Sequence, residues 1–509
     1  MKKTTLYILC LLTTFCLLPG CDSGFDEINV NKTQPIALDP AFLLNNAIIQ
    51  SSFPLEAVVF EIPIVQQIVT PFGGVLGGGN YNQDNKPRNG ANWVRYYQAV
   101  TKSLVSVLDA TQADDKKTNL YHSARILRAF ATMILTDSYG DVPYAEAGQG
   151  FIAGLALPKY DSQESIYKDI LKELDEASAA LDATKPLVTT DVLYGGNIPS
   201  WKAFGYSLML RAAMRLSKVD QTLAQQYVTK AVTGGVIQTN AGGAVVRHST
   251  AYNNGIGAFV NGPEANNYYL AGPFVDYLKS NNDPRLKAIS VRYVGAKSGP
   301  NQTAATANTD PAVQIGMPMG YDNGTIIARA TADGLASFYD YSQLDRTRLG
   351  KIDAPCFLVT NAQTKLLLAE AVVRNWTSGD AAVLYSDAIR AHMVEMTQSS
   401  ASSTIPTADI DAYIAAHPLD AGNALRDINT QYWVATFLNG PEAFANFRRS
   451  GFPALTKNPY PAQEITTGDF VRKLTYPDTE LGINVANVQE AITRQGGNKL
   501  DTRVWWDKQ

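Results

Sequence analysis

The segment from Ala124 to Ala147 constrains the fold more than any other part of this chain. Its first half has apolar residues at helical spacing along one face, namely Ile126, Leu127, Phe130, Met133, Ile134 and Leu135. Gly140 follows them and favours a helix C-terminus, and Pro143 cannot continue a helix. The segment therefore predicts a long amphipathic helix that ends at a defined turn and packs its apolar face against other helices.

Other segments repeat this pattern and predict that helices pack in pairs. Ala91–Leu108 and Ser162–Leu181 each have an apolar stripe at helical spacing. Small and bulky residues also alternate at a spacing that matches tetratricopeptide repeats (TPR), with substitutions: Trp201, Phe204, Gly205 and Leu208; Ala224, Val228 and Ala231; Ala369, Val372, Ala381, Tyr385 and Ala388. A small residue on one helix lets a bulky residue on its partner approach closely, and stacked pairs bury a continuous face. The sequence thus predicts a mainly α fold on a TPR-like scaffold of helical pairs, an α-α superhelix.

The N-terminus has the pattern of a lipoprotein signal. Lys2 and Lys3 form a positive region, and the apolar run Leu6–Leu18 is too short to span a bilayer. The run ends at Leu18-Pro19-Gly20-Cys21, which resembles a lipobox, with a small residue before the cysteine whose thiol carries the lipid. We predict a signal peptide at 1–20, lipidation of Cys21 by several acyl chains and a polar tether over 21–38. An ordinary signal peptide that happens to contain a cysteine is the alternative.

Composition narrows the class of protein further. The formal net charge is -4 and no basic patch or arginine-rich helix is present in the sequence, which argues against nucleic-acid binding. Only 18% of the residues are charged, while 25 are tyrosine, a composition that suits an extracellular surface. Removal of the signal peptide and lipidation of Cys21 would leave Cys356 without a cysteine to pair with, so we expect it to be a small buried residue.

The sequence has no motif for a resident cofactor. Its four histidines form no H-E-x-x-H metal site. Gly77-Gly78-Gly79 lacks the Lys-Ser/Thr that follows in a phosphate-binding loop, so Pro71–Arg88 is predicted to be either a mobile surface loop or a loop that faces a ligand. A structural calcium ion bound by the loop Tyr81–Asn85 remains an alternative, although no calcium-loop spacing is complete there.

Several stretches resemble one protein family. Asp137–Tyr144 (DSYGDVPY) is similar to the central signature of SusD/RagB-like proteins, surface lipoproteins that sit on TonB-dependent importers in Bacteroidetes outer membranes. Further matching elements are Asn281–Leu286 (NNDPRL), Lys365–Arg374 (KLLLAEAVVR), Asn439–Phe444 and Phe447–Gly451. The resemblance implies one SusD-like domain over 39–509, with helical pairs at 39–234 and 361–509. Between them, residues 235–360 are expected to form an irregular ligand-loop region with short strands and one helix near Pro273–Lys279.

The resemblance also implies a function. The chain is expected to be a non-catalytic lipoprotein of the outer membrane, facing the cell exterior, that captures a glycan and passes it to a SusC-like TonB-dependent transporter. Capture of oligopeptides, as in RagB-like members, is an alternative. A surface glycoside hydrolase is a further alternative, since Asp137 and Asp141 have a spacing that a carboxylate pair could use, although carboxylates at a helix end usually cap turns.

Glycan capture requires exposed aromatic rings beside amide groups, because sugar C–H faces stack on rings and sugar hydroxyls pair with amides and charged groups. Three clusters fit this description: Asn80, Tyr81 and Asn82 with Trp93; Asn267, Tyr268 and Tyr269; Phe338, Tyr339 and Tyr341. The resemblance implies that the first loop and the middle region lie near one another. In the alternative interpretation, these rings only pack within their loops, and Trp93 belongs to the core stripe of its helix.

Overall fold

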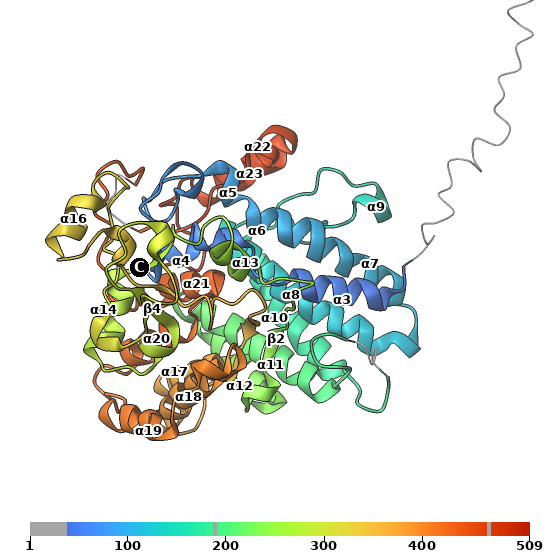
Figure 1. The fold of residues 1–509 in the computed structure, drawn as a ribbon. Helices are drawn as coiled ribbons and strands as arrows, with labels where there is room; N and C mark the ends of the chain where they lie inside the picture. The colour runs from blue at the N-terminus through green and yellow to red at the C-terminus, as the bar shows by residue number, and fades with distance from the viewer. Residues whose placement is uncertain (1–37, 187–190, 466–469, 509) are drawn as a thin grey trace, which may run out of the picture. The chain divides into compact units, whose positions relative to one another are not determined.

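Helices that pack side by side make up most of the structure (Figure 1). This computed structural model describes residues 38–186, 191–465 and 470–508. The chain divides into two units, Met1–Asp39 and Pro40–Gln509, and almost all described residues belong to the second. The predicted signal peptide at 1–20 and Cys21 lie outside the described residues, as does the tether apart from residue 38.

The first set of helices contains the long helix predicted from Ala124–Ala147. Its members are α3 (Pro40–Gln50), α6 (Ala91–Val94), the π-helical run η3 (Arg95–Thr101), α7 (Lys102–Thr111), α8 (Thr118–Tyr139), α10 (Gln163–Ala180), α11 (Ile198–Arg215) and α12 (Gln221–Gly234). Helix α8 packs on α7 and α10, α10 packs on α11, and α11 packs on α12. Helix α8 ends where the sequence predicts, because Gly140 follows it with a φ of +84° that other residues rarely adopt.

A close helix crossing explains one of the small residues in the repeat pattern. A Cβ atom added to Gly205 of α11 would lie 2.1 Å from Ser178 Oγ of α10. Any larger residue would force Ser178 or the helix crossing to shift, so glycine favours this close approach. Trp201 and Phe204, from the same stretch, are completely buried. The TPR-like packing of a small residue against a neighbouring helix is therefore confirmed at this crossing.

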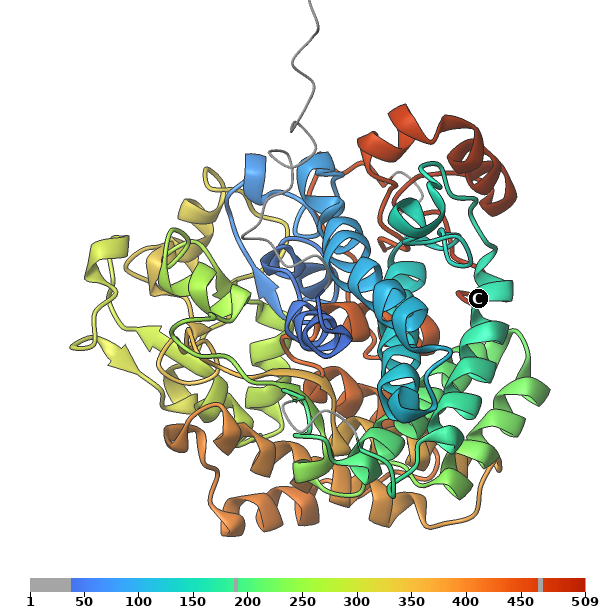
Figure 2. The same cartoon turned by 90° about the vertical axis from the view of Figure 1, so that its right-hand side faces the viewer.

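The second set of helices lies next to the first (Figure 2). Its members are α17 (Asn361–Val373), α18 (Ala381–Glu395), α19 (Thr407–Ala416), α20 (Ala424–Ala435), α21 (Gly440–Ser450), α22 (Asp478–Ile483) and α23 (Val485–Gln495). Helix α17 packs on α18 and α20 within the set, and it also packs on α11. One buried hydrophobic cluster runs through both sets, so the mainly α, paired-helix architecture predicted from the sequence is confirmed.

The region between the two sets is irregular. Its helices are α13 (Gly255–Asn261), α14 (Gly272–Ser280), α15 (Arg285–Ile289) and α16 (Ile326–Ala332), and its strands are β2 (Ala244–Val246), β3 (Tyr269–Leu270), β4 (Ser290–Tyr293), β5 (Ala307–Asn308), β6 (Gln343–Leu344) and β7 (Cys356–Val359). The expectation of a single helix there is wrong, because three of these helices span two turns or fewer and show no periodicity in the sequence. Strand β1 (Ile68–Val69) pairs antiparallel with β3. This pairing brings the start of the loop Pro71–Arg88 next to the irregular region 235–360.

Three short α-helices of the described residues lie outside these groups: α4 (Glu61–Ile64), α5 (Lys86–Asn89) and α9 (Gly150–Ala153). Among the described residues, no helix is both long and apolar enough to cross a membrane.

The signature residues form buried polar links between distant segments. Asp137 accepts hydrogen bonds from Arg215 Nε at 3.2 Å and from Trp506 Nε1 at 2.9 Å. Asp141 accepts from the backbone N–H of Gln163 at 2.8 Å, at the start of α10, and from Arg494 Nε at 2.5 Å. The signature therefore holds the end of α8 against α10, α11 and the C-terminal segment.

Candidate functional site

The first predicted cluster, Asn80, Tyr81 and Asn82, is buried, although the sequence predicts it on an exposed loop. Asn80 Nδ2 donates to the carbonyl oxygen of Thr70, and Asn82 Nδ2 donates to Gln463 Oε1, both at 2.8 Å. The predicted exposure is wrong because these amides have partners within the protein. One of the partners lies almost 400 residues along the chain, where local sequence cannot reveal it.

The glycines of this loop explain its tight path. A Cβ atom on Gly78 would lie 2.8 Å from the carbonyl oxygen of Val59, and one on Gly79 would lie 2.4 Å from that of Phe60. Both distances are shorter than real Cβ contacts, and the atoms they meet belong to the backbone. The mobile-loop interpretation is therefore wrong for residues 76–82, which are buried against the segment before α4.

We expect Gly79→Ala to lower the free energy of unfolding by about 1–3 kcal/mol, because the added methyl group must displace the backbone of Phe60. Urea denaturation followed by circular dichroism measures the change. Gly482→Ala is the matched control, since no atom lies within 4 Å of its added Cβ. Equal stability of the two variants would contradict the close packing of this loop.

Trp93 belongs to the core and is 6% exposed. Its ring lies 4.7 Å from that of Tyr97, 5.3 Å from that of Tyr139 and 6.0 Å from those of Tyr160 and Tyr476, centroid to centroid. Such a cage of rings stabilises the packing of distant segments. The expectation that Trp93 is exposed to a ligand is wrong, and the alternative core role is the one found.

The second cluster is also largely buried. Tyr268 is 5% exposed and packs on Phe259, with ring centroids 5.3 Å apart. Tyr269 is completely buried. Asn267 remains half-buried, and its Nδ2 donates to Glu264 Oε2 at 2.5 Å. The predicted exposure of both tyrosines is therefore wrong, since their rings fill the space around β3.

The third cluster is divided between the core and the surface. Tyr341 is completely buried, and its hydroxyl group donates to Asp333 Oδ2 at 2.7 Å. Phe338 is 9% exposed, so the exposure predicted for these two rings is wrong. Tyr339 is half-buried, and its ring stacks on Phe338 with centroids 4.2 Å apart. Of the aromatic residues predicted to bind a glycan, Tyr339 is the one that keeps a partly exposed ring.

The structure brings the first loop to the third cluster, as the resemblance implies. The ring of Phe72 lies 6.0 Å from that of Phe338. Phe72, Tyr321 and Tyr339 are half-buried and pack on the same small hydrophobic cluster. Half-buried Tyr460 lies close by, because its ring centroid is 4.4 Å from that of Tyr81. We call the surface formed by the accessible residues of 71–85, 315–341 and 456–465 the three-loop face.

Sequence reasoning missed three of these rings, those of Phe72, Tyr321 and Tyr460. One signal for Tyr460 was available, since it lies between Pro459 and Pro461 in a stretch with no helical period. Phe72 and Tyr321 had no such signal, because their exposure depends on how the three segments pack together.

An open groove of about 480 Å³ borders this face. Its polar wall includes Asp276, Arg329, Asp333, Thr456 and Lys457, and its apolar wall includes Ile315, Pro318, Met319 and Pro459. The volume is in the range of ligand-binding clefts. Mixed apolar and charged walls of this kind can pack against a sugar ring and pair with its hydroxyl groups.

Two carboxylates of the groove differ in their surroundings. Desolvation raises the pKa of Asp276. Desolvation acts on Asp333 in the same direction, but hydrogen bonds from Arg329 and Tyr341 outweigh it, so the pKa of Asp333 lies below its usual value. Arg329 Nε and Nη2 lie 3.0 and 2.9 Å from the two oxygens of Asp333. This bidentate pair keeps the guanidinium group fixed at the wall of the groove.

The described residues give little support for a glycosidase site or a metal site. Asp137 and Asp141 are 5% and 4% exposed, and both already bind cationic side chains, which argues against a glycosidase pair. Within the described ranges, no group of three or more His, Cys, Asp and Glu side chains is arranged to hold a metal ion. In the loop considered for calcium, Asn85 Nδ2 donates to the carbonyl oxygen of Gly77 at 2.6 Å.

Comparison with known proteins places this geometry in a family. A family model described as "Starch-binding associating with outer membrane", of the SusD-like class, matches residues 31–477. A solved structure titled "chitin-binding protein" is 28% identical, with a TM-score of 0.81 over 92% of this chain and 100% of its own. A structure titled "Bacteroidetes AC2a SusD-like" is 27% identical, with a TM-score of 0.80 over 93% and 100%.

A chitin-binding SusD homolog from Flavobacterium johnsoniae shares the fold at 24% identity, with a TM-score of 0.75 over 92% of this chain and 98% of its own. No curated protein matches the chain significantly. The family model covers most of the sequence, so the chain belongs to the SusD-like family, as its signature predicted.

Proposed function

We propose that this protein is a non-catalytic lipoprotein of the outer-membrane surface, anchored through Cys21, that captures a glycan on the three-loop face. It then passes the glycan to a SusC-like TonB-dependent transporter. The observation that carries this proposal is the similarity to a chitin-binding protein over the whole length of that protein. The family's description as starch-binding and associated with the outer membrane supports the same class of ligand and the same location.

The three-loop face offers the chemistry that such a ligand needs. Tyr339, Phe72 and Tyr460 present partly exposed rings. Arg329 and Lys457 contribute cationic groups to the adjoining groove, and both are exposed. Rings stack on the C–H faces of sugars, while charged groups pair with hydroxyl and acetamido oxygens. Because the 28% identical protein is titled chitin-binding, chitooligosaccharides are the first ligands to test.

We expect Tyr339→Ala to weaken glycan binding by about fivefold or more, since loss of one stacked ring costs roughly 1 kcal/mol or more. Calorimetric titration of the full-length protein in detergent with chitooligosaccharides, malto-oligosaccharides and a peptide digest measures the affinity. Tyr227→Ala is the matched control, because Tyr227 is a half-buried tyrosine on α12, outside this face.

The outcomes separate the candidate functions. Glycan binding that Tyr339→Ala weakens and Tyr227→Ala leaves unchanged supports capture on the three-loop face. Binding to peptides alone would move the protein to the RagB-like alternative. Glycan binding that responds instead to Gln98→Ala would place the ligand in a second open groove, of about 770 Å³, beside η3. Release of shortened glycan would overturn the non-catalytic assignment.

Partnership with the transporter needs a separate experiment. We expect the protein to co-purify from outer membranes with a SusC-like barrel encoded by a neighbouring gene. Cys21→Ala should release the protein from the membrane fraction if the cysteine carries the lipid. Membrane retention of Cys21→Ala without a lipid label would contradict the anchor and leave glycan capture untouched.

A further inference from the structure

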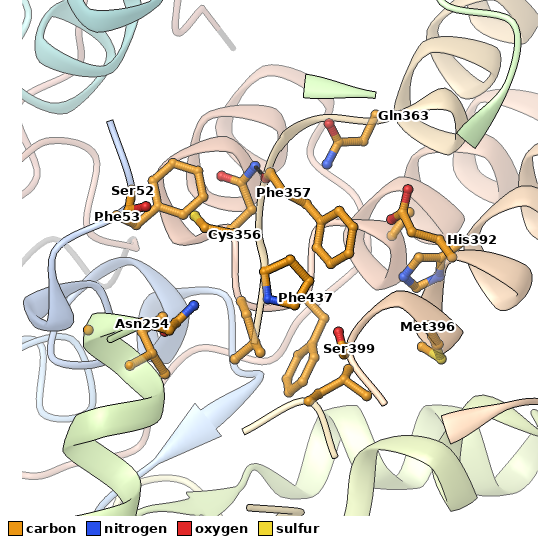
Figure 3. Close-up of a pocket in the computed structure, with 18 residues that line it drawn as sticks. Ser52, Phe53, Asn254, Cys356, Phe357, Gln363, His392, Met396, Ser399 and Phe437 are labelled. Carbon is orange, nitrogen blue, oxygen red and sulfur yellow. Dashed lines mark hydrogen bonds between the residues drawn. The ribbon is translucent and has the colours of Figure 1, made fainter. Parts of the chain in front are cut away.

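A small cavity is lined by residues of β7 and shares no lining residue with the groove of the three-loop face (Figure 3). Its volume is about 60 Å³, enough for a few water molecules or a group of several non-hydrogen atoms. Phe53, Phe357, Phe437 and Met396 supply its apolar wall. Phe357 and Phe437 are only half-buried, so this side of the cavity borders solvent.

A carboxyl group without a partner lines this cavity. Glu395, the last residue of α18, is 5% exposed, and within the described structure its carboxyl group has no hydrogen-bond or ion-pair partner. Burial alone raises its pKa to about 8, with no cation to oppose the shift. Buried polar groups are almost always satisfied, so an unpaired carboxyl group facing a cavity indicates that something else completes its bonding.

Two hydrogen-bond donors line the same cavity. Arg285 Nη1 lies 3.1 Å from His392 Nδ1. Because a guanidinium group can only donate, Nδ1 accepts, and the neutral ring carries its proton on Nε2. Gln363 Oε1 accepts from Arg211 Nη2 at 2.7 Å, which leaves the amide nitrogen of Gln363 free to donate. Figure 3 shows this nitrogen turned toward the middle of the pocket.

The wall of the cavity also contains a strained residue. Leu438 has a φ of +69°, which bulky residues rarely adopt. The next residue, Asn439, donates from Nδ2 to the carbonyl oxygen of Phe357 at 3.1 Å and so fixes this turn against β7. Backbone strain that the surrounding structure maintains is concentrated at functional sites.

We propose that this cavity is a binding site for a compact neutral amide, the size of an acetamide or N-acetyl group. The amide oxygen accepts from His392 Nε2 and Gln363 Nε2, the amide N–H donates to Glu395, and the methyl group packs against Phe357 and Phe437. An ammonium ion would satisfy Glu395 but would leave both donors without an acceptor, and a purely apolar ligand would leave all three groups unsatisfied. This site is separate from glycan capture, so each proposal can fail without the other.

Acetamide itself is the probe that tests this site. Saturation-transfer NMR on the full-length protein is expected to show saturable binding in the millimolar range, as a ligand of so few atoms allows. Acetone, which has the same shape but no N–H, should bind at least tenfold more weakly. Glu395→Met should abolish acetamide binding, while Glu395→Gln should retain it, because glutamine keeps both the shape and the hydrogen-bonding capacity.

Ser399→Leu is a second blocking variant, because Ser399 also lines the cavity and a leucine there fills it while the carboxyl group of Glu395 is kept. Both blocking variants should keep the circular dichroism spectrum of the unaltered protein, which shows that they fold whether or not the protein binds chitooligosaccharides. Equal binding of acetamide and acetone, unchanged binding in Glu395→Met or Ser399→Leu, or no saturable binding to the unaltered protein would each overturn the proposal. The last result would leave a cavity that holds only water.

Discussion

Replacing Glu370 by alanine is expected to lower the free energy of unfolding by roughly 3–5 kcal/mol, because it leaves a buried arginine without its counter-charge. Glu370 Oε1 accepts from Arg449 Nη1 at 2.6 Å, and Oε2 accepts from Arg449 Nη2 at 2.7 Å. Neither side chain has any exposed surface. Asn429 Nδ2 and Arg374 Nε complete the bonding of the carboxylate at 3.0 and 2.9 Å.

Urea denaturation of the full-length protein, followed by tryptophan fluorescence, measures the loss. Glu164→Ala is the matched control, since Glu164 also pairs with a cation four residues later on a helix, Lys168, but on an exposed surface. Such a pair contributes about 0.3–0.5 kcal/mol. A loss in Glu370→Ala no larger than that in Glu164→Ala would contradict the buried network.

The same network predicts sensitivity to acid. Desolvation raises the pKa of Glu370, but the charges and hydrogen bonds of Arg449 and Arg374 outweigh it and lower the pKa to about 2. Glu370 therefore stays ionised to a lower pH in the folded state than in the unfolded chain. Its contribution to stability is present above the ordinary pKa of a glutamate and is lost as the pH falls toward 2. Glu370→Gln should lack this acid-dependent part of the unfolding free energy.

This network also shows what the sequence could predict about the fold. The stretches around Glu370 and Arg449 carried the family resemblance, which placed them in the predicted helical pairs of 361–509, on helices that the structure contains. Their pairing across 79 residues was not predictable, because it depends on how α17 and α21 meet. The π-helical run at Arg95–Thr101 was likewise hidden, since its stripe of Tyr96, Tyr97 and Val100 also fits an α-helix.

The candidate site was less predictable than the fold, for a related reason. Asn80 and Tyr81 have the composition of an exposed loop, yet both are buried. Asn458 donates from Nδ2 to the carbonyl oxygen of Asn80 at 2.6 Å, and Tyr460 packs on Tyr81. Loop composition indicates where the chain leaves regular structure, but exposure depends on whether a distant segment covers the loop. The same limit explains why the partial exposure of Phe72 and Tyr321 was not predicted. Tyr339 was predicted to be exposed, and its ring is partly exposed.

Glu395→Gln is expected to make the protein more stable than the unaltered chain at neutral to alkaline pH, by roughly 2–5 kcal/mol at pH 9. Burial raises the pKa of Glu395 to about 8, so the folded state keeps a proton that the unfolded chain loses near its ordinary pKa. Stability from this group is therefore fully present below about pH 4 and is lost as the pH rises through 8. Glutamine resembles the protonated carboxyl group and does not ionise, so its variant avoids that loss.

Other titrating groups near Glu395 do not produce the same profile. Burial and the charge of Arg285 lower the pKa of His392 well below its usual value, and burial raises the pKa of the Cys356 thiol to about 11. Both groups are therefore neutral between pH 5 and 9 in the folded protein, and they are unchanged in the variant. A difference between the two proteins across this range consequently reports on Glu395 itself.

Urea denaturation at intervals from pH 4 to pH 9 measures this difference, with Glu490→Gln as the control for an exposed glutamate on a helix. The unfolding free energies of Glu395→Gln and the unaltered protein should coincide near pH 4 and diverge as the pH rises. Parallel profiles would mean that Glu395 ionises normally, which requires a counter-charge or free access of water to the cavity. Acetamide binding to the cavity predicts a further result in the same assay at pH 7. Added acetamide should raise the unfolding free energy of the unaltered protein and of Glu395→Gln by similar amounts, and should not raise that of Glu395→Met or Ser399→Leu.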